Sequence, residues 1–382
     1  MTFAENPLFR AAAGRRIVLG HDWLTGMRGG ERVLEQFCRA FPEAPLATLL
    51  ANPSSVSEAI RDRPIITSFM QRIPGVTRNY RKMLPIMGAA ATSLRIPPGD
   101  LLLTTSSCVA HAFHPARGMK MLCYCFTPMR YAWLFPREYL GPVKAALAAP
   151  YFAYLRRWDR RHAQHVDRFV AISRHVQTRI REFYGRESDV VYPPVDTDRY
   201  TPASDGGAAN GGYDLIVSAL VPYKRIDLAV EAYGRLGHPL KVVGIGSGAA
   251  KIARGAAANV EFLGWRSDED ILALYRNCRF LIFPGEEDYG LVPLEAMACG
   301  KPVIAFGRGG ATETVVDGET GLFFGEQTAD ALCEAVVRGE KVDWDPAAIR
   351  ARALAFGVPQ FLDGMARCIG ETLVGPQGET LA

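Results

Sequence analysis

Two short apolar runs constrain the fold of this chain more than any other feature. Residues 280–284 read Phe-Leu-Ile-Phe-Pro, and residues 302–306 read Pro-Val-Ile-Ala-Phe. Continuous apolar runs of this length are typical of parallel strands that are buried on both faces. The segment between them is long enough for the helical crossover that joins two parallel strands. The pair therefore predicts an α/β fold with a parallel sheet.

The same alternation of strand and helix recurs on both sides of a glycine-rich stretch. Helical spacing over residues 31–41 places Val33, Leu34, Phe37 and Phe41 on one face. Helical patterns also cover residues 225–236 and 268–277. Further strand-like runs occupy residues 16–20, 101–104, 121–125, 169–172, 215–217, 240–244 and 260–263. This order predicts two doubly wound, Rossmann-like domains that face one another across a cleft.

The domain boundary is predicted from composition. Residues 205–212 read Asp-Gly-Gly-Ala-Ala-Asn-Gly-Gly, which is typical of a linker. A length of 382 residues also suits two domains. We expect an N-terminal domain over residues 1–204, a linker over 205–212 and a C-terminal domain over 213–344. Residues 345–382 are expected to form a helical segment that packs back on the junction.

Composition excludes several classes of protein. Apolar residues make up 48% and charged residues 22% of the chain, as in ordinary globular proteins. No apolar run reaches the roughly 18 residues of a membrane span, and the first residues, with Glu5 and Arg10, do not resemble a secretion signal. The eight cysteines are scattered, which argues against a zinc site and a disulfide framework. A cytoplasmic protein is expected.

The charge is unevenly distributed. Residues 1–200 carry 28 Lys and Arg against 16 Asp and Glu, and residues 201–382 carry 16 against 24. Much of the basic excess lies between residues 156 and 181. The arginines concerned are Arg156, Arg157, Arg160, Arg161, Arg168, Arg174, Arg179 and Arg181. Two interpretations stay open: a solvated helix face, or a surface for anionic lipid head groups at the inner leaflet of a membrane or for a pyrophosphate-linked acceptor. No motif for nucleic-acid binding accompanies the arginines, so no nucleic-acid partner is expected.

Two glutamates dominate the segment between the two apolar runs. Glu287 and Glu295 would be separated by about 12 Å of rise if both were helical. A carboxylate pair that acts on one sugar carbon by double displacement needs a separation of about 5–5.5 Å. We therefore expect Glu287 to reach the reacting group and Glu295 to hold a distant hydroxyl pair such as a ribose. On spacing alone, a capping acid and an exposed helical acid would explain the same residues.

Several ordered motifs resemble one enzyme family. In the second half these are Pro222–Asp227, the two glutamates, Ala296–Ile304, Gly307–Val315 and Asp317–Leu322. Together they resemble the C-terminal domain of family 4 retaining glycosyltransferases, which have the two-domain GT-B fold. In the first half, residues 28–34 and 192–196 are similar to a branch whose members use GDP-mannose or related GDP-sugars.

The resemblance implies roles for individual residues. It implies that Lys224 binds the donor diphosphate with help from Arg225, and that Glu287 completes the catalytic group. Donor binding is expected from Gly29, Gly30, Ser173, Lys224, Arg225, Asp288, Tyr289, Gly290, Leu291 and Glu295. A cation and helix amides suit these roles because they stabilise charge that develops on the leaving diphosphate. No metal or other cofactor is expected, since no Asp-x-Asp cluster is placed to suit Mg²⁺ or Mn²⁺.

Two positions depart from the family pattern. Ala219 stands where the family usually has an arginine that binds the diphosphate, and Phe126 stands where it usually has a histidine near the donor sugar. Phenylalanine removes a hydrogen-bonding side chain there. His21, after the first strand, is a polar residue that could serve in its place.

The sequence thus predicts a metal-independent, retaining glycosyltransferase at the cytoplasmic membrane face. It would move a sugar from a GDP donor to a lipid-linked or polysaccharide acceptor in cell-surface glycan synthesis. The alternative is a weak or inactive GT-B homologue that binds nucleotide-sugars or serves as a scaffold. A nicotinamide-dependent oxidoreductase is disfavoured, because Gly244–Gly248 does not follow the first strand and lacks an acidic ribose partner.

Overall fold

The computed structural model describes residues 5–134, 141–203 and 212–374. It divides into two compact units, one formed by residues 1–193 and 361–382 and the other by residues 194–360. The two units, here called unit 1 and unit 2, are described separately. None of the helices in the described ranges is both long and apolar enough to span a bilayer.

Unit 1 contains a parallel sheet of seven strands in the order β3-β2-β1-β4-β5-β6-β7. The strands are β1 (Ile17–His21), β2 (Leu46–Thr48), β3 (Ile65–Thr67), β4 (Leu101–Ser106), β5 (Lys120–Cys125), β6 (Arg168–Ala171) and β7 (Ser188–Val190). Every residue of β1 and β4 is buried, as predicted for central parallel strands.

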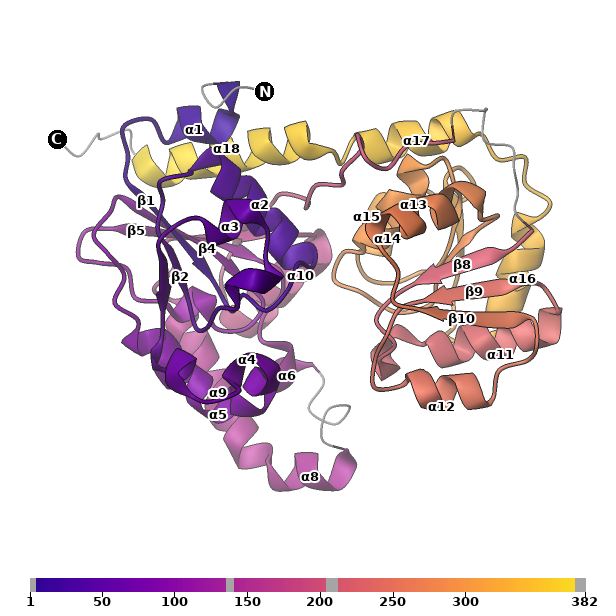
Figure 1. Ribbon diagram of the computed structural model, residues 1–382, viewed down its shortest axis with the longest axis horizontal. Helices are drawn as coiled ribbons and strands as arrows, with labels where there is room; N and C mark the ends of the chain where they lie inside the picture. Colours follow the sequence, from indigo (N-terminus) through magenta and orange to yellow (C-terminus); the bar gives the residue numbers. More distant parts are fainter. Residues whose placement is uncertain (1–4, 135–140, 204–211, 375–382) are drawn as a thin grey trace. The chain divides into compact units, whose positions relative to one another are not determined.

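Helices cover both faces of the unit 1 sheet (Figure 1). The α-helices are α1 (Pro7–Ala11), α2 (Gly29–Ala40), α3 (Glu58–Arg61), α4 (Val76–Asn79), α5 (Leu84–Ser93), α6 (Arg130–Trp133), α8 (Pro142–Leu147), α9 (Ala149–Ala163), α10 (Arg174–Arg179) and α18 (Val358–Val374). The 3-10 helices are η2 (Pro53–Ser55), η3 (Phe69–Arg72), η4 (Tyr80–Met83) and η5 (Ala110–Ala112), and η6 (Ile180–Tyr184) is a π-helix. Helix α2 buries Val33, Leu34, Phe37 and Phe41, the four residues that its sequence spacing placed on one face.

Unit 2 repeats the strand order of unit 1 with one strand fewer. Its sheet has the order β10-β9-β8-β11-β12-β13, and all the pairings are parallel. The strands are β8 (Asp214–Val217), β9 (Leu240–Val243), β10 (Val260–Gly264), β11 (Leu281–Phe283), β12 (Val303–Phe306) and β13 (Gly321–Phe324). The runs at 280–284 and 302–306 thus form adjacent buried strands, as predicted.

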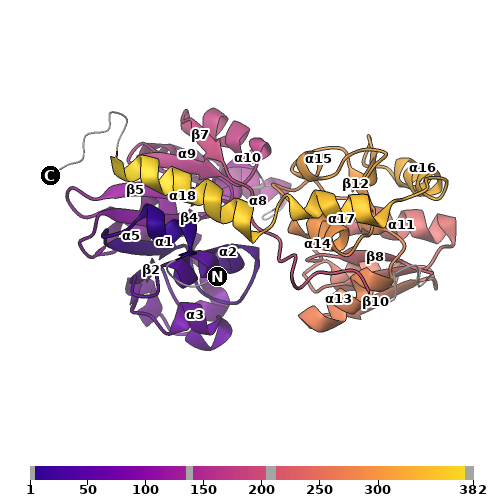
Figure 2. The ribbon, with the colours of Figure 1, turned by 90° about the horizontal axis from the view of Figure 1, so that it is seen from above.

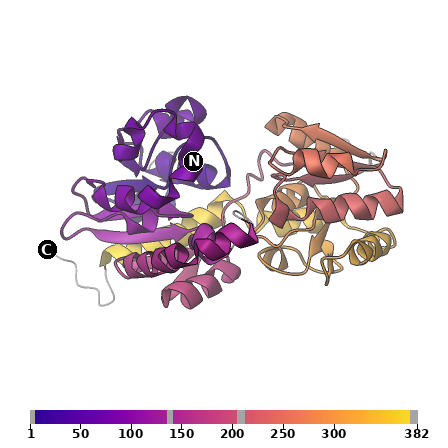
Figure 3. The same ribbon diagram turned by 90° about the horizontal axis from the view of Figure 1, so that it is seen from below.

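Two layers of helices enclose the unit 2 sheet (Figure 3). They are α11 (Ile226–Leu236), α12 (Ala249–Arg254), α13 (Asp268–Asn277), α14 (Leu291–Ala298), α15 (Ala311–Thr314), α16 (Ala329–Gly339) and α17 (Pro346–Leu354), with the short turn η7 (Pro222–Lys224) before α11. Figure 1 shows α13, α14 and α17 on one face and α11, α12 and α16 on the other. Two Rossmann-like units with a helical C-terminus therefore form the molecule.

The expected C-terminal helical segment consists of two helices that contact different units. Helix α17 packs on α14 of unit 2. The chain turns at residues 355–357, and α18 then packs on unit 1, as seen from above in Figure 2. There the Phe361 ring lies 5.6 Å from the Phe37 ring and 5.7 Å from the Tyr124 ring. Residues 375–382 of the predicted segment lie outside the described residues.

The units divide at residue 193, before the predicted boundary at 204. The stretch from Pro194 to Thr201 belongs to unit 2 because its backbone is bonded there. The Val195 amide donates to the Phe356 carbonyl at 2.9 Å, and the Arg350 guanidinium donates to the Tyr200 carbonyl at 2.9 Å. The Arg276 guanidinium likewise donates to the Thr201 carbonyl at 2.8 Å. Most of the predicted linker, residues 205–211, lies outside the described residues.

Candidate functional site

The loops that follow β8 and β11 carry the two residues expected to perform the chemistry. These strands are neighbours in the unit 2 sheet, so the loops at their carboxyl ends meet at one edge. Lys224 lies in η7 after β8, and Glu287 lies between β11 and α14. Lys224 Nζ and Glu287 Oε1 form an ion pair, and the side chains are only 14% and 20% exposed. The structure thus brings the two residues together.

This ion pair can respond to a ligand. Partial burial strengthens electrostatic interactions relative to water, and the Lys224 ammonium group also lies 5.4 Å from the centre of the Tyr223 ring. An anionic ligand that reaches Lys224 would compete with Glu287 for the cation. The carboxylate would then be released to interact with a neighbouring electron-poor centre.

The backbone of Glu287 is held from the next loop. The Gly310 amide donates to the Glu287 carbonyl at 2.8 Å, and Glu287 and Gly309 form an isolated β-bridge. This loop follows β12, so three adjacent strands of one sheet contribute to the site. The motif at residues 307–315 therefore has a structural role, because it fixes the position of Glu287.

Arg225 has an unusual backbone conformation. Its φ of 53° is the only positive value for a non-glycine residue in the described ranges. Such a conformation is uncommon for a residue with a Cβ, and it is frequent at functional sites. The guanidinium donates to Gln327 Oε1 at 3.3 Å, and Gln327 in turn donates to the Pro284 carbonyl at 3.0 Å. Arg225 is thus joined to the end of β11 through Gln327, a residue that the sequence motifs did not indicate.

The residues predicted to contact the donor sugar surround the start of α14. Asp288 and Tyr289 are buried, Gly290 precedes the helix with a φ of 93°, and Leu291 is its first residue. Glycine suits this position because its backbone conformation is left-handed and a Cβ would lie 3.0 Å from the Phe283 ring. The amides at this helix start can face an anion.

Glu295 occupies a different environment from Glu287. It lies on α14 and accepts a hydrogen bond of 2.9 Å from the Tyr275 hydroxyl. Burial, reinforced by the neighbouring Glu295 carboxylate, raises the pKa of Tyr275 well above its usual value, so the phenol is a neutral donor. Tyr275 was not predicted either. Its one sequence signal was a tyrosine on the buried face of α13, where a hydroxyl needs a partner.

Gly29 and Gly30 begin α2 in unit 1, at the carboxyl end of β1. A Cβ at Gly30 would lie 3.3 Å from the Phe126 ring and 3.7 Å from His21 Cε1. His21 and Phe126 therefore lie close to the same glycine, so the histidine stands beside the position where the family pattern would place an imidazole.

The hydrogen bonds of His21 define its tautomer. The Thr105 hydroxyl donates to the Gly20 carbonyl at 3.2 Å, so its oxygen accepts the 2.7 Å hydrogen bond from His21 Nδ1. With the hydroxyl donating in this direction, Nδ1 carries a proton and Nε2 keeps a lone pair. His21 can therefore accept a hydrogen bond from a hydroxyl group, which Phe126 cannot.

Ser173 has a structural role in unit 1. Its hydroxyl accepts a hydrogen bond of 3.0 Å from the Val176 amide and caps α10. The side chain is fully buried. Donor binding by Ser173 stays a prediction.

Metal ligands were not expected. Three Asp-x-Asp sequences do occur, at residues 196–198, 268–270 and 343–345. Asp268 forms an ion pair with Arg199, and Asp270 accepts a hydrogen bond from the Ser267 amide at the start of α13. Within the described ranges, no group of three or more His, Cys, Asp or Glu residues is arranged to hold a metal ion.

Two family models match the chain. The model described as Glycosyltransferase Family 4 matches residues 27–199, and the model described as Glycosyl transferases group 1 matches residues 210–348. The chain belongs to the family 4 type of glycosyltransferases. The second match contains the Lys224–Glu287 pair, and the first contains Gly29, Gly30 and Phe126.

Curated relatives match part of this glycosyltransferase. An uncharacterized glycosyltransferase, MJ1178, of Methanocaldococcus jannaschii is 30% identical over 45% of this chain and 49% of that protein. A D-inositol 3-phosphate glycosyltransferase of Mycobacteroides abscessus is 35% identical over 39% of each chain. A GDP-mannose-dependent alpha-(1-6)-phosphatidylinositol monomannoside mannosyltransferase of Mycolicibacterium smegmatis is 30% identical over 46% of this chain and 54% of that protein. The chain spans about half or less of the length of these relatives.

Solved structures match the fold over almost the whole chain. Anabaena Alr3699/HepE in complex with UDP has a TM-score of 0.68 at 19% identity, covering 93% of this chain and 100% of that one. The lipopolysaccharide outer core galactosyltransferase WaaB in its apo form has a TM-score of 0.63 at 16% identity, covering 93% and 99%. At these identities the likeness establishes the GT-B fold alone.

Proposed function

We propose that this glycosyltransferase moves mannose or a related sugar from a GDP-linked donor, with retention of configuration, to a lipid-linked or polysaccharide acceptor. The pathway would be the synthesis of a cell-surface glycan. The observation that supports transfer best is the Lys224–Glu287 ion pair at the carboxyl edge of the unit 2 sheet. It combines a cation for the diphosphate with a carboxylate beside the reacting sugar.

The proposed chemistry follows from these charges. The bond between C1 of the sugar and the phosphate oxygen breaks, and its electron pair remains on the nucleoside diphosphate. An acceptor hydroxyl gives its proton to the departing phosphate oxygen and forms the new bond to C1 on the same face. Lys224 and the amides at the start of α14 stabilise the diphosphate, while the Glu287 carboxylate faces the positive charge that develops on the sugar. Glu295, held by Tyr275, binds the distant part of the donor.

The GDP donor is supported by one relative and is not specified by the fold. The mannosyltransferase of M. smegmatis is named as GDP-mannose-dependent, whereas the Anabaena structure contains UDP. Thermal unfolding with GDP, UDP and ADP discriminates between donors, because a ligand that binds the native state stabilises it by mass action. We expect the largest stabilisation with GDP, and a larger effect of UDP would replace the proposed donor.

The reaction needs no metal in this proposal, because Lys224 and helix amides supply the positive charge. Turnover with a GDP-sugar should therefore survive dialysis against a chelator. The arginines between residues 156 and 181 support a cytoplasmic protein that binds the inner leaflet of a membrane, where a lipid-linked acceptor would lie.

The alternative is a homologue that binds a nucleotide-sugar without transferring it. Two observations favour it: Ala219 supplies no charge after β8, and Arg225 is directed to Gln327. Calorimetry with GDP followed by turnover with cell lipid extract separates the two functions. GDP binding with no transfer or hydrolysis of any GDP- or UDP-sugar would leave only the binding function.

A further inference from the structure

Helices α8 and α9 present an outward stripe that the proposed transfer reaction does not use. The stripe consists of Val143, Leu147, Tyr154, Arg157 and Arg161. Val143 is 72% exposed, Leu147 80% and Tyr154 62%, and both arginines are exposed. Val143 and Leu147 are four residues apart on α8, and Tyr154, Arg157 and Arg161 follow one another at intervals of three and four on α9, so each set lies on one side of its own helix. Consecutive helices therefore expose three large apolar side chains and two cations.

The opposite side of the two helices is anchored in unit 1. Phe152, Leu155, Asp159 and Ala163 of α9 are buried, and so is Ala145 of α8. Trp158 packs against α5, since a Cβ at Gly88 would lie 3.1 Å from its ring. The stripe residues of α9 are thus exposed on a helix that is packed along its other side, whereas Ala145 alone is buried among the described side chains of α8. Figure 1 shows α8 at the far end of these helices, projecting from the rest of unit 1.

The charges around the stripe have a single sign. Residues 141–165 contain five cations and one carboxylate, Asp159. Asp159 is fully buried, accepts a hydrogen bond of 2.7 Å from the Trp133 indole and lies 3.0 Å from His111. The exposed surface of this segment therefore carries no carboxylate.

The arginines differ in what they contact. The Arg156 guanidinium donates to the Ala132 carbonyl at 3.0 Å and is used within the fold. Arg157, Arg160 and Arg161 instead line one open groove with Gln164, Tyr184 and Gly185. Three guanidinium groups along one groove suit phosphate oxygens, which arginine binds with two parallel hydrogen bonds.

We propose that the stripe docks on a bilayer of anionic phospholipid. Val143 and Leu147 enter the boundary of the acyl chains, the Tyr154 ring lies at the level of the head groups, and the arginines bind lipid phosphates. Apolar side chains beside cations on one side of a helix are typical of segments that lie in a membrane interface. Single exposed apolar residues need no such explanation, but a series of them beside unopposed cations does.

This inference rests on the proposed membrane association and identifies the residues responsible for it. The stripe differs from the broader basic region at residues 156–181. In that region Arg168 forms an ion pair with Asp189 at 2.7 Å, and Arg181 forms one with Glu187 at 2.8 Å. Membrane docking also requires no sugar transfer. Donor hydrolysis in solution is measured separately, so failure of docking and failure of the enzyme can be distinguished.

The test is co-sedimentation of the purified full chain with vesicles. We expect binding to vesicles of equal parts phosphatidylglycerol and phosphatidylcholine, and none to pure phosphatidylcholine. Leu147→Ser should lower the partition coefficient about tenfold, because it removes one inserted side chain. Arg157→Gln together with Arg161→Gln should also lower it about tenfold, and salt should have the same effect.

Matched variants in unit 2 provide the controls. Leu354→Ser changes another exposed leucine, and Lys251→Gln with Arg254→Gln removes two exposed cations from α12. All four proteins should unfold at the same temperature, and the controls should bind vesicles as the wild type does. No binding by the wild type, equal binding to pure phosphatidylcholine, or equal losses in the controls would overturn the proposal.

Two other occupants would be recognised by the same variants. If Leu147→Ser converts a dimer into a monomer in size-exclusion chromatography, the stripe is a contact between copies of this chain. If the arginine variant releases co-purified nucleic acid and still binds vesicles, the groove belongs to a nucleic acid. Either result overturns membrane docking.

Discussion

The two units share a strand order, but their equivalent strands β1 and β8 have a buried aspartate at opposite ends. In unit 1, Asp22 lies just beyond the carboxyl end of β1. In unit 2, Asp214 lies at the amino end of β8, the strand with the equivalent place in the order. Both side chains are almost fully buried. The same fold thus uses a buried aspartate on the equivalent strand in two different ways.

Asp22 orders the edge of unit 1 where ligands of α/β folds bind. Its carboxylate accepts hydrogen bonds from the Ser107 amide at 2.6 Å and hydroxyl at 2.9 Å, the Val109 amide at 2.8 Å and the Ala110 amide at 2.7 Å. The loop after β4 is therefore fixed by a residue at the end of β1. In unit 1, stability and the site edge depend on the same carboxylate.

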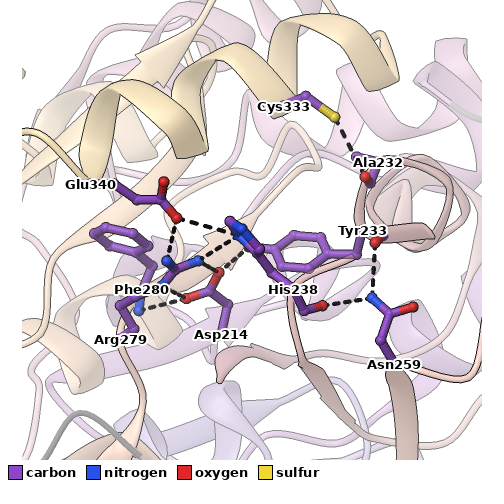
Figure 4. Close-up of polar contacts among 9 residues, drawn as sticks. All are labelled: Asp214, Ala232, Tyr233, His238, Asn259, Arg279, Phe280, Cys333 and Glu340. Carbon is purple, nitrogen blue, oxygen red and sulfur yellow. Dashed lines mark hydrogen bonds and ion pairs between the residues drawn. The ribbon is translucent and has the colours of Figure 1, made fainter. Parts of the chain in front are cut away.

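Asp214 works at the edge away from the site. It accepts hydrogen bonds from Arg279 at 3.0 and 2.7 Å and from the Tyr233 hydroxyl at 2.5 Å (Figure 4). Arg279 also forms an ion pair with Glu340, and His238 Nδ1 lies 3.3 Å from the Glu340 carboxylate. In unit 2 the Asp214 network is thus separate in the fold from the residues proposed to react.

The largest effect is expected at the reactive edge of unit 2. Glu287→Ala should lower the turnover of a GDP-sugar at least about a hundredfold, because it removes charge stabilisation at the reacting centre. GDP binding, measured by calorimetry, should be nearly unchanged, whereas Glu295→Ala should weaken it. Glu286→Ala, at the adjacent position, is the control. Equal behaviour of the Glu287 and Glu295 variants would contradict the division of labour.

Breaking the Asp214 network should affect stability without affecting chemistry. Asp214→Ala should cost about 3 kcal/mol of unfolding free energy, because Arg279 then loses its buried partner. Asp330→Ala, which removes an exposed partner of Arg235, should cost less than about 1 kcal/mol. Urea unfolding measures both, and turnover per folded molecule should stay at the wild-type value.

Asp22→Ala should lower both stability and turnover, and an unchanged turnover there would remove the contrast between the units.

A smaller effect is expected at the glycine edge of unit 1. His21→Phe should lower turnover about tenfold, as loss of one hydrogen-bonding group in a site commonly does. Thr105→Val removes the acceptor that fixes the tautomer and should reproduce part of the loss. Phe126→His adds an imidazole beside Gly30 and should restore activity to the His21 variant. If His21→Phe turns over normally, the imidazole takes no part in the reaction.

The smallest effect concerns the support of Glu295. Tyr275→Phe removes one buried hydrogen bond, worth about 1 kcal/mol, and should weaken GDP binding about fivefold. The rate at saturating donor should stay unchanged, because the reacting centre is not touched. Tyr213→Phe, which removes a hydroxyl bonded to the Leu274 carbonyl of the same helix, is the control. An equal effect of both variants would indicate a general loosening of α13.

The central strands and the amphipathic helices were predictable because their patterns are local. Periodicity located β1, β4, β5, β11, β12 and the buried face of α2. The strands β2, β3, β7 and β13 were missed, and each has only three or four residues. The conformation of Arg225 was also missed. Its left-handed φ follows η7 in the chain, and nothing in its own side chain indicates it.

The site was predictable as a set of residues but not as an arrangement. Motifs identified Lys224 and Glu287 separately, and their ion pair depends on β8 and β11 being neighbours. Tyr275 and Gln327 act on the site from distant positions, so no local motif includes them. Val143 and Leu147 are of residue types that usually lie in a protein core, and only their exposure in the fold distinguishes them from core residues.

The return of α18 to unit 1 has a consequence for biosynthesis. The chain leaves the ribosome from its N-terminus, and domains usually fold in that order. Here Phe361, which packs between Phe37 and Tyr124, is made only after the whole of unit 2. The apolar face of nascent unit 1 therefore stays uncovered until unit 2 has been synthesised. Translation speed and chaperone supply then become determinants of yield for this enzyme, with no change in any residue of its site.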